Sequence, residues 1–274
     1  QQNKVLKLPD NGIDKNRTGG IALGDGTFFG GIAEGEPLNR FYGYVATGII
    51  ETEEQAANAN YDALSRLPQK GAKRVGDYEW ADRNGDGQIT TADQFCLGVT
   101  VPPFTGGLQN SFRLKNWTLS LYLDWATGHS IFDESYSRYF YGTFTNNYAL
   151  AKDVLKAWKK PGDKTKYAKF YANDSNWGND NYNRSPTNTF TYKGDYLCLR
   201  EITLQYSLPS KLFTKVGLKG VTLTVSGNNL CYLTEVKGIS PETGASTTYE
   251  GSGDNAYYNY PPIRRFSFGV RLIF

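Results

Sequence analysis

Arg264–Phe274, Arg-Arg-Phe-Ser-Phe-Gly-Val-Arg-Leu-Ile-Phe, is the stretch of sequence that decides the fold. Successive residues of a β-strand point to opposite faces of a sheet, so its alternating apolar residues would form one continuous face. About ten alternating residues also suffice for a tilted strand to cross a membrane. The segment therefore predicts either a half-buried strand of a soluble β-sandwich or a strand of a membrane barrel. The apolar positions are Phe266, Phe268, Val270, Leu272 and Phe274.

The same alternation recurs in three further segments, and this repetition favours the barrel. Residues 117–125 place two Trp and three Leu on one face, with the aromatic rings at the ends. An aliphatic band between two aromatic girdles is typical of transmembrane barrels. Residues 200–206 and 221–227 alternate as well. We therefore predict an all-β fold built from membrane-spanning strands.

The composition agrees with a barrel and excludes several other classes of protein. Mean hydropathy is −0.52, as expected when apolar residues occupy only alternate positions. No run of about eighteen apolar residues occurs, which excludes a helical membrane span. The net charge of +3, from 30 basic and 27 acidic residues, is too balanced to indicate binding to nucleic acid. The three cysteines, whose pairing stays open, are Cys96, Cys198 and Cys231.

Motifs of catalysis and of secretion are missing from the sequence. His129, the single histidine, follows segment 117–125, where the rim of a barrel is expected. There is no Gly-x-Ser-x-Gly elbow and no His-Glu-x-x-His pair, so we do not expect an enzyme. The sequence begins at Gln1 without a signal-peptide pattern, so we expect that a further segment precedes it.

Long and short connections alternate between the predicted strands. The turns near 114–116 and 207–220 are short. Outer-membrane barrels have short periplasmic turns and longer extracellular loops. We therefore expect three extracellular loops, at 51–103, 132–195 and 231–263.

The second long region is rich in aromatic side chains beside amides. Aromatic faces stack on sugar rings, and amides form hydrogen bonds with sugar hydroxyls. The same residues could instead stiffen the loop or dock a protein partner, because aromatic residues dominate protein interfaces. The candidate contact residues for a substrate or partner are Tyr136, Tyr139, Tyr141, Trp177 and Tyr182.

Residues 82–93, Asp-Arg-Asn-Gly-Asp-Gly-Gln-Ile-Thr-Thr-Ala-Asp, have the spacing of a calcium-binding loop. Oxygens fall at positions one, three, five, seven and twelve, and a glycine stands at position six. Position twelve is Asp93 rather than the usual glutamate, and the flanks lack the helix pair of an EF-hand. The alternative is a turn rich in Asn, Asp and Gly that holds no ion. The candidate Ca²⁺ ligands are Asp82, Asn84, Asp86, Gln88 and Asp93.

Six short motifs occur in a fixed order and span nearly the whole chain. They are Phe-Tyr-Gly-Tyr at 41–44, Asp-Arg-Asn-Gly-Asp-Gly-Gln-Ile at 82–89, Phe-Thr-Gly-Gly at 104–107, Tyr-Leu-Cys-Leu-Arg-Glu-Ile-Thr-Leu-Gln-Tyr-Ser-Leu-Pro at 196–209, Ser-Gly-Asn-Asn-Leu at 226–230 and Pro-Pro at 261–262. Together these motifs resemble the C-terminal third of SusC/RagA-type TonB-dependent transporters. Cys198 and Glu201 replace the family's usual strand residues.

The resemblance implies both a fold and a function. The fold is a 22-stranded antiparallel transmembrane β-barrel, of which residues 1–274 form the C-terminal barrel segment, without the plug domain, TonB box and earlier strands. The implied function is import of an oligomeric nutrient, glycan in preference to peptide, across the outer membrane of a Gram-negative bacterium. The implied partners are a SusD-like surface lipoprotein, the TonB complex and outer-membrane lipid. The alternative is a secreted, calcium-stabilised β-rich glycan-binding module.

Overall fold

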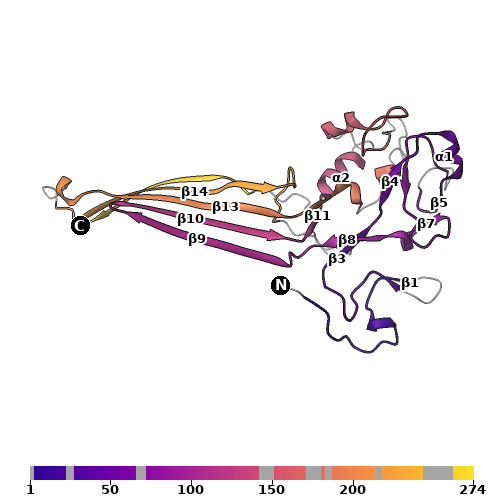
Figure 1. Ribbon diagram of the computed structural model, residues 1–274, viewed down its shortest axis with the longest axis horizontal. Helices are drawn as coiled ribbons and strands as arrows, with labels where there is room; N and C mark the ends of the chain where they lie inside the picture. The colour runs from indigo at the N-terminus through magenta and orange to yellow at the C-terminus, as the bar shows by residue number, and fades with distance from the viewer. Residues whose placement is uncertain are drawn as a thin grey trace.

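The computed structural model describes residues 3–22, 28–65, 72–141, 151–170, 180–182, 187–213, 217–242 and 262–274. A long antiparallel sheet and a body of short strands and helices make up most of these residues (Figure 1). The second part lies at one end of the sheet, and we call its described residues within 40–99 and 128–195 the loop module.

The five-stranded sheet contains the strands that the apolar alternation predicts. Neighbouring strands are antiparallel in the order β15-β14-β13-β10-β9. The predicted all-β fold class is therefore confirmed, with the sheet unclosed within the described residues. The strands are β9 (Phe104–Leu114), β10 (Trp117–Thr127), β13 (Tyr196–Ser207), β14 (Gly220–Thr234) and β15 (Arg265–Ile273).

The register sorts the side chains onto an apolar and a polar face, because paired residues of neighbouring strands lie on the same side. Val225 of β14, for example, pairs with Leu204 of β13 and with Phe268 of β15. Asn110 is a polar exception on the apolar face, opposite Leu121. The large apolar residues of this face are Phe104, Leu108, Phe112, Leu114, Trp117, Leu119, Leu121, Leu123, Trp125, Leu197, Leu199, Ile202, Leu204, Tyr206, Val221, Leu223, Val225, Leu233, Phe266, Phe268, Val270 and Leu272.

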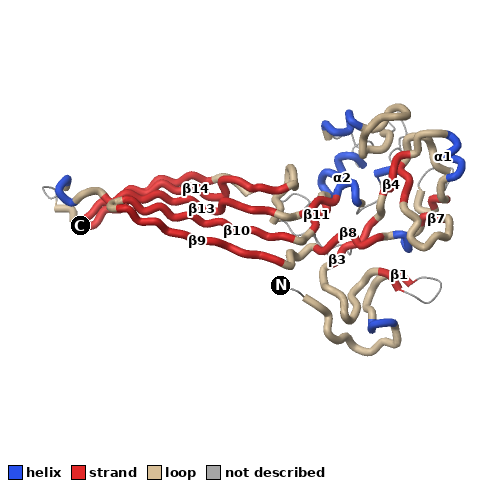
Figure 2. The backbone as a smooth tube through the Cα atoms, viewed as in Figure 1, coloured by secondary structure: helices blue, strands red, loops and turns tan. Residues whose placement is uncertain are grey.

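Short turns leave the sheet at one end and long connections at the other (Figure 2). Leu114 pairs with Trp117, so only two residues form the β9–β10 turn, and Lys115 adopts a φ of 51° there. The connection from β10 to β13 instead passes through the whole second part of the loop module. Strand β14 continues to Thr234, so the last long connection begins after Thr234 rather than at 231.

Short strand pairs and two α-helices form the loop module and the segment before it. Thr52 caps α1 through a reciprocal capping box with Gln55, which explains why the helix begins there. No helix in the described ranges is long and apolar enough to cross a bilayer. The α-helices are α1 (Glu53–Asn58) and α2 (Glu134–Tyr141). The paired strands are β1 (Ile21–Ala22) with β2 (Phe28–Phe29), β3 (Arg40–Gly43) with β8 (Phe95–Val99), β4 (Ala46–Ile49) with β6 (Tyr78–Trp80), β5 (Tyr61–Asp62) with β7 (Gln88–Ile89), and β11 (Ser130–Phe132) with β12 (Thr191–Lys193).

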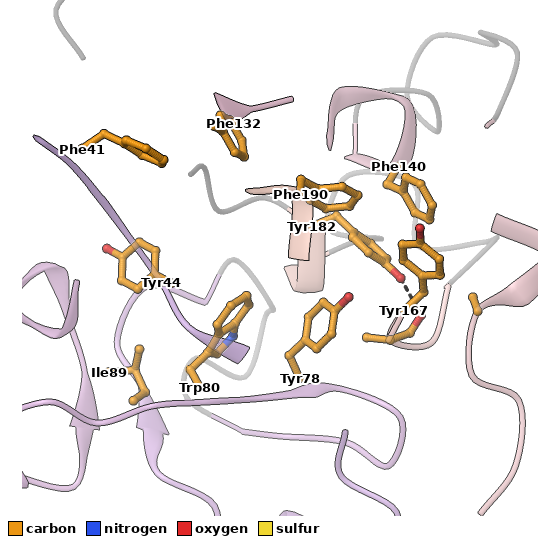
Figure 3. Close-up of a cluster of buried hydrophobic side chains, with 12 residues drawn as sticks. Phe41, Tyr44, Tyr78, Trp80, Ile89, Phe132, Phe140, Tyr167, Tyr182 and Phe190 are labelled. Atoms are coloured by element: carbon orange, nitrogen blue, oxygen red, sulfur yellow. Dashed lines mark hydrogen bonds between the residues drawn. The ribbon is translucent and has the colours of Figure 1, made fainter. Parts of the chain in front are cut away.

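An aromatic core joins the two halves of the loop module (Figure 3). Tyr78 of β6 packs edge-on against Tyr182, with ring centroids 5.8 Å apart. Phe140 of α2 lies 5.2 Å from the rings of both Tyr182 and Phe190. Segments separated by a hundred residues of sequence therefore share one hydrophobic core. Its buried members are Phe41, Tyr44, Tyr78, Trp80, Ile89, Phe132, Phe140, Ala157, Tyr167, Ala168, Tyr182 and Phe190.

Candidate functional site

Arg200 is the centre of a hydrogen-bonded network on the polar face of the sheet. Its Nε and Nη2 donate to the two carboxylate oxygens of Asp124 at 2.8 and 2.7 Å. Its Nη1 donates to Asn229 Oδ1 at 3.0 Å and to Tyr232 Oη at 3.2 Å. Such bidentate, charge-assisted pairs are the strongest class of side-chain hydrogen bond. One guanidinium therefore ties β10, β13 and β14 together.

A bulge in β13 gives Arg200 this position. Pairing with β10 passes directly from Leu199 to Glu201, so Arg200 is the extra residue of β13 relative to β10. On the other side of β13, Asn229 and Leu230 of β14 lie opposite Arg200. An extra residue would otherwise shift every later side chain to the opposite face. Here Leu199 and Ile202 both stay on the apolar face, because the bulge absorbs the additional position.

The segment that follows β14 is fastened to this network. Glu242 Oε1 accepts hydrogen bonds from Arg200 Nη2 at 2.6 Å and from Tyr232 Oη at 2.7 Å. His129, expected at the rim, lies just beyond β10 with 5% of its surface exposed, and its Nε2 is 3.2 Å from the carbonyl oxygen of Pro241. Both contacts hold residues 235–242 against the loop end of the sheet.

Two of the predicted contact residues, Tyr182 and Tyr136, pack in or against the aromatic core of the loop module. Tyr182 is 2% exposed, and its hydroxyl donates to the Ala168 carbonyl at 2.6 Å. The protein's own side chains cover its ring in this structure, and contact of Tyr182 with a substrate or partner stays a prediction. Tyr136 is partly buried against Phe140, and its hydroxyl donates to Asp153 Oδ2 at 2.6 Å.

The remaining predicted contact residues cannot be compared with the structure. Trp177 lies outside the described residues. Tyr139 and Tyr141 belong to α2, but their side chains also lie outside what the structure describes. Ligand contact by these three residues stays a prediction.

The calcium-like loop is closed by hydrogen bonds within itself. Asp82 accepts from the backbone N–H groups of Gly85 and Gly87 at 2.7 and 2.8 Å. Asp93 is buried and accepts from the N–H groups of Arg83 and Thr90 at 2.9 and 2.7 Å. Among the described residues, no three His, Cys, Asp or Glu side chains form a group that could hold a metal. Calcium binding stays a prediction, beside the alternative of a turn rich in Asn, Asp and Gly.

A cavity of about 400 Å³ lies between β4, the turn at 163–166 and β12. Its walls include Gly48, Lys166 and Tyr192, which are far apart in the sequence and belong to no recognisable motif. The sequence contains no local signal for such a site, because the site exists only after the two halves of the loop module have packed together.

Known proteins similar to this chain are TonB-dependent receptors. The chain is 29% identical over 283 residues to TonB-dependent receptor P3 of Formosa agariphila, which covers 100% of this chain and 26% of that receptor. TonB-dependent receptor P39 of the same organism is 29% identical over 275 residues, covering 89% of this chain and 25% of the receptor. No protein-family model matches the chain.

Solved structures of similar fold include the RagAB peptide importer. The match to its 'open-open' state covers 99% of this chain and 25% of the solved importer chain, with a TM-score of 0.63 and 21% sequence identity. Its 'closed-closed' state matches 88% of this chain, with a TM-score of 0.56 and 20% identity. The predicted resemblance to SusC/RagA-type TonB-dependent transporters is thereby confirmed. The chain spans about a quarter of the length of the relatives it matches.

Proposed function

From this similarity to one quarter of TonB-dependent receptors, we propose that the chain forms part of the barrel wall and extracellular loops of an outer-membrane nutrient importer in a Gram-negative bacterium. The observation that carries the proposal is the continuous apolar face of the five-stranded sheet. On this face Phe266 and Phe268 are 74% and 78% exposed. Exposure of so large an apolar surface to water is energetically unfavourable, whereas contact with the hydrocarbon of a membrane is favourable.

The dimensions of the apolar face fit a bilayer. Trp117 and Trp125 lie eight positions apart on β10, which corresponds to roughly 27 Å along a strand. The apolar band of an outer-membrane barrel is about 25 Å tall, with aromatic girdles at both interfaces. The Trp117 ring packs against Tyr206 of β13 at a centroid distance of 4.4 Å with the ring planes tilted by 36°, as two members of one girdle would. The loop module would then stand outside the membrane.

The proposed substrate is an oligomeric nutrient, with a glycan favoured over a peptide. Polar and aromatic side chains of the loop module support a glycan, because sugars offer hydroxyl groups and apolar ring faces. The similarity in fold to a peptide importer makes peptide the alternative. A SusD-like surface lipoprotein and the TonB complex are the proposed partners. The secreted glycan-binding module is disfavoured by the exposed apolar face.

Deletion of the gene in its native host, followed by growth on single oligomeric nutrients, tests this function. We expect growth to fail on one class of oligosaccharide and to continue on the corresponding monosaccharide. The native protein should fractionate with outer membranes, shift in gel mobility on heating, and co-purify in detergent with a lipoprotein. A monodisperse protein in the culture medium would contradict the proposal.

We also propose calcium as the ligand of the 82–93 loop, which supplies oxygens at every expected position. Calcium titration of the full-length protein in detergent, followed by calorimetry, should give one binding event. Replacement of Asp82 by Asn should weaken that binding at least tenfold, whereas replacement of the exposed Asp10, which lies outside the loop, should leave it unchanged. The absence of any saturable calcium binding would favour the ion-free turn.

A further inference from the structure

The cavity beside β4 has a rigid polar wall. The Asn188 side chain accepts a hydrogen bond from the Ala46 N–H group at 3.0 Å and donates to the Ala46 carbonyl at 3.1 Å. This double contact fixes β4 against the segment that leads into β12, across 142 positions of sequence. The wall is therefore in place before any ligand arrives, which lowers the entropic cost of binding.

Two side chains offer hydrogen-bond donors to the cavity. The Tyr192 hydroxyl has no hydrogen-bond partner among the described residues, and burial raises the pKa of Tyr192 to about 12, so the hydroxyl stays protonated at neutral pH. The exposed Lys166 donates to the Thr189 carbonyl at 3.1 Å, its one hydrogen bond within the described part of the chain. An ammonium group has three donors, so two are available to a ligand.

Two carboxylates on the cavity wall offer acceptors. Glu51 uses Oε2 to accept from the Gly162 N–H group at 3.2 Å. Asp163 uses Oδ2 to accept from the N–H groups of Lys159 and Lys160 at 2.9 and 3.0 Å. The second oxygen of each carboxylate has no hydrogen bond in the described ranges. Donors and acceptors therefore line the same cavity.

Gly48 contributes no side chain to the cavity wall, so the backbone is accessible at this position. A Cβ atom built on Gly48 would meet no atom within 4 Å, so the glycine is not required by close packing. A glycine inside a strand often marks a place where a ligand approaches the backbone. Ile49 and the Tyr192 ring supply apolar surface in the same cavity.

We propose that this cavity binds one sugar unit of a neutral glycan, an inference that rests on the proposed import function. Sugar hydroxyls both donate and accept hydrogen bonds, which matches a wall that carries both kinds of group. The charged groups of the wall are one ammonium and two carboxylates, so a net negative charge disfavours acidic sugars and phosphates. A volume of about 400 Å³ lies in the lower part of the range of small-ligand sites.

Binding by the full-length transporter in detergent tests the proposal. The probes are an array of neutral oligosaccharides, uronic-acid oligosaccharides and tripeptides, and calorimetry then measures affinity for the best neutral oligosaccharide. Replacement of Tyr192 by Phe removes the free hydroxyl and should weaken binding about three- to tenfold. Replacement of Gly48 by Leu fills the cavity and should abolish measurable binding. Replacement of Tyr61 by Phe is the matched control, because this exposed tyrosine of β5 lies away from the cavity.

Each outcome separates this inference from the proposed function. Unchanged affinity in both the Tyr192 and Gly48 variants, with nutrient uptake intact, would overturn the sugar site and leave the import function standing. Binding of wild-type protein to tripeptides but to no oligosaccharide would overturn the sugar site and the preference for glycan. Because Tyr192→Phe preserves the ring, it decides the question even if Gly48→Leu fails to assemble.

Discussion

Tyrosine hydroxyls determine how the aromatic core of the loop module is joined to the surrounding backbone. Tyr182 donates to the Ala168 carbonyl at 2.6 Å, and Tyr78 donates to the Lys166 carbonyl at 2.8 Å. The acceptors lie at the last residue of the 163–166 turn and two residues beyond it. A phenylalanine would fill the same volume but would leave a buried carbonyl without its partner, which is costly in an apolar environment.

The first prediction concerns Tyr182. Replacement by Phe should lower the free energy of unfolding of the loop module by about 1 to 3 kcal/mol, because the buried Ala168 carbonyl loses its donor. Hydrogen exchange on the full-length protein should show faster exchange around residues 157–169 and little change in the sheet. Tyr61→Phe serves as the control at an exposed position. Unaltered exchange in the Tyr182 variant would mean that water replaces the lost donor.

The second prediction concerns pH and Asp153. Hydrogen bonds from Lys156 and Tyr136 hold the pKa of Asp153 below its ordinary value. A carboxyl group with a lowered pKa in the folded state stabilises the fold above its ordinary pKa of about 3.9, and this stabilisation is lost as the pH falls through the folded value. The near-ultraviolet circular dichroism of the loop module should therefore weaken below about pH 4. Asp153→Asn should remove this component of the pH dependence, and an identical acid transition in that variant would refute the assignment.

At the scale of elements, the alternation of apolar residues alone predicts four of the five strands of the sheet, namely β10, β13, β14 and β15. Each prediction needs only local sequence, because a strand repeats every two residues whatever its neighbours are. The bulge at Arg200 is different, because it becomes visible only when β13 is aligned with β10. The role of Tyr182 also depends on a distant part of the chain, because its ring packs against Tyr78, 104 positions away. Aromatic composition alone does not distinguish a hydrophobic core from a binding surface.

The third prediction tests the two faces of β14. Val225 lies on the apolar face and Thr224 on the polar face, at adjacent positions of one strand. Replacement of Val225 by Arg should destabilise the membrane-inserted protein by about 2 to 4 kcal/mol, as a charge near the bilayer centre does. Thr224→Arg should have a much smaller effect. The fraction of heat-modifiable protein in outer membranes measures both effects, and equal losses would contradict the assignment of the apolar face to lipid.

At the scale of the whole molecule, the sheet has two unpaired edges within the described residues. Strands β9 and β15 each pair with a single neighbour, so one row of backbone groups on each is left without a strand partner. In hydrocarbon every backbone group must be satisfied, which is why membrane barrels close. The loop module, by contrast, buries its own aromatic core and does not need the membrane for that.

The final prediction follows from this difference between the two parts. A polypeptide of residues 1–274 produced alone in water should aggregate through the edges of β9 and β15 and through the apolar face of the sheet. Its aggregates should disperse in detergent, and light scattering measures both states. Limited proteolysis in detergent should leave the aromatic core of the loop module protected. A monodisperse 30.6 kDa species in water would contradict the prediction, because a soluble protein must keep that apolar face covered.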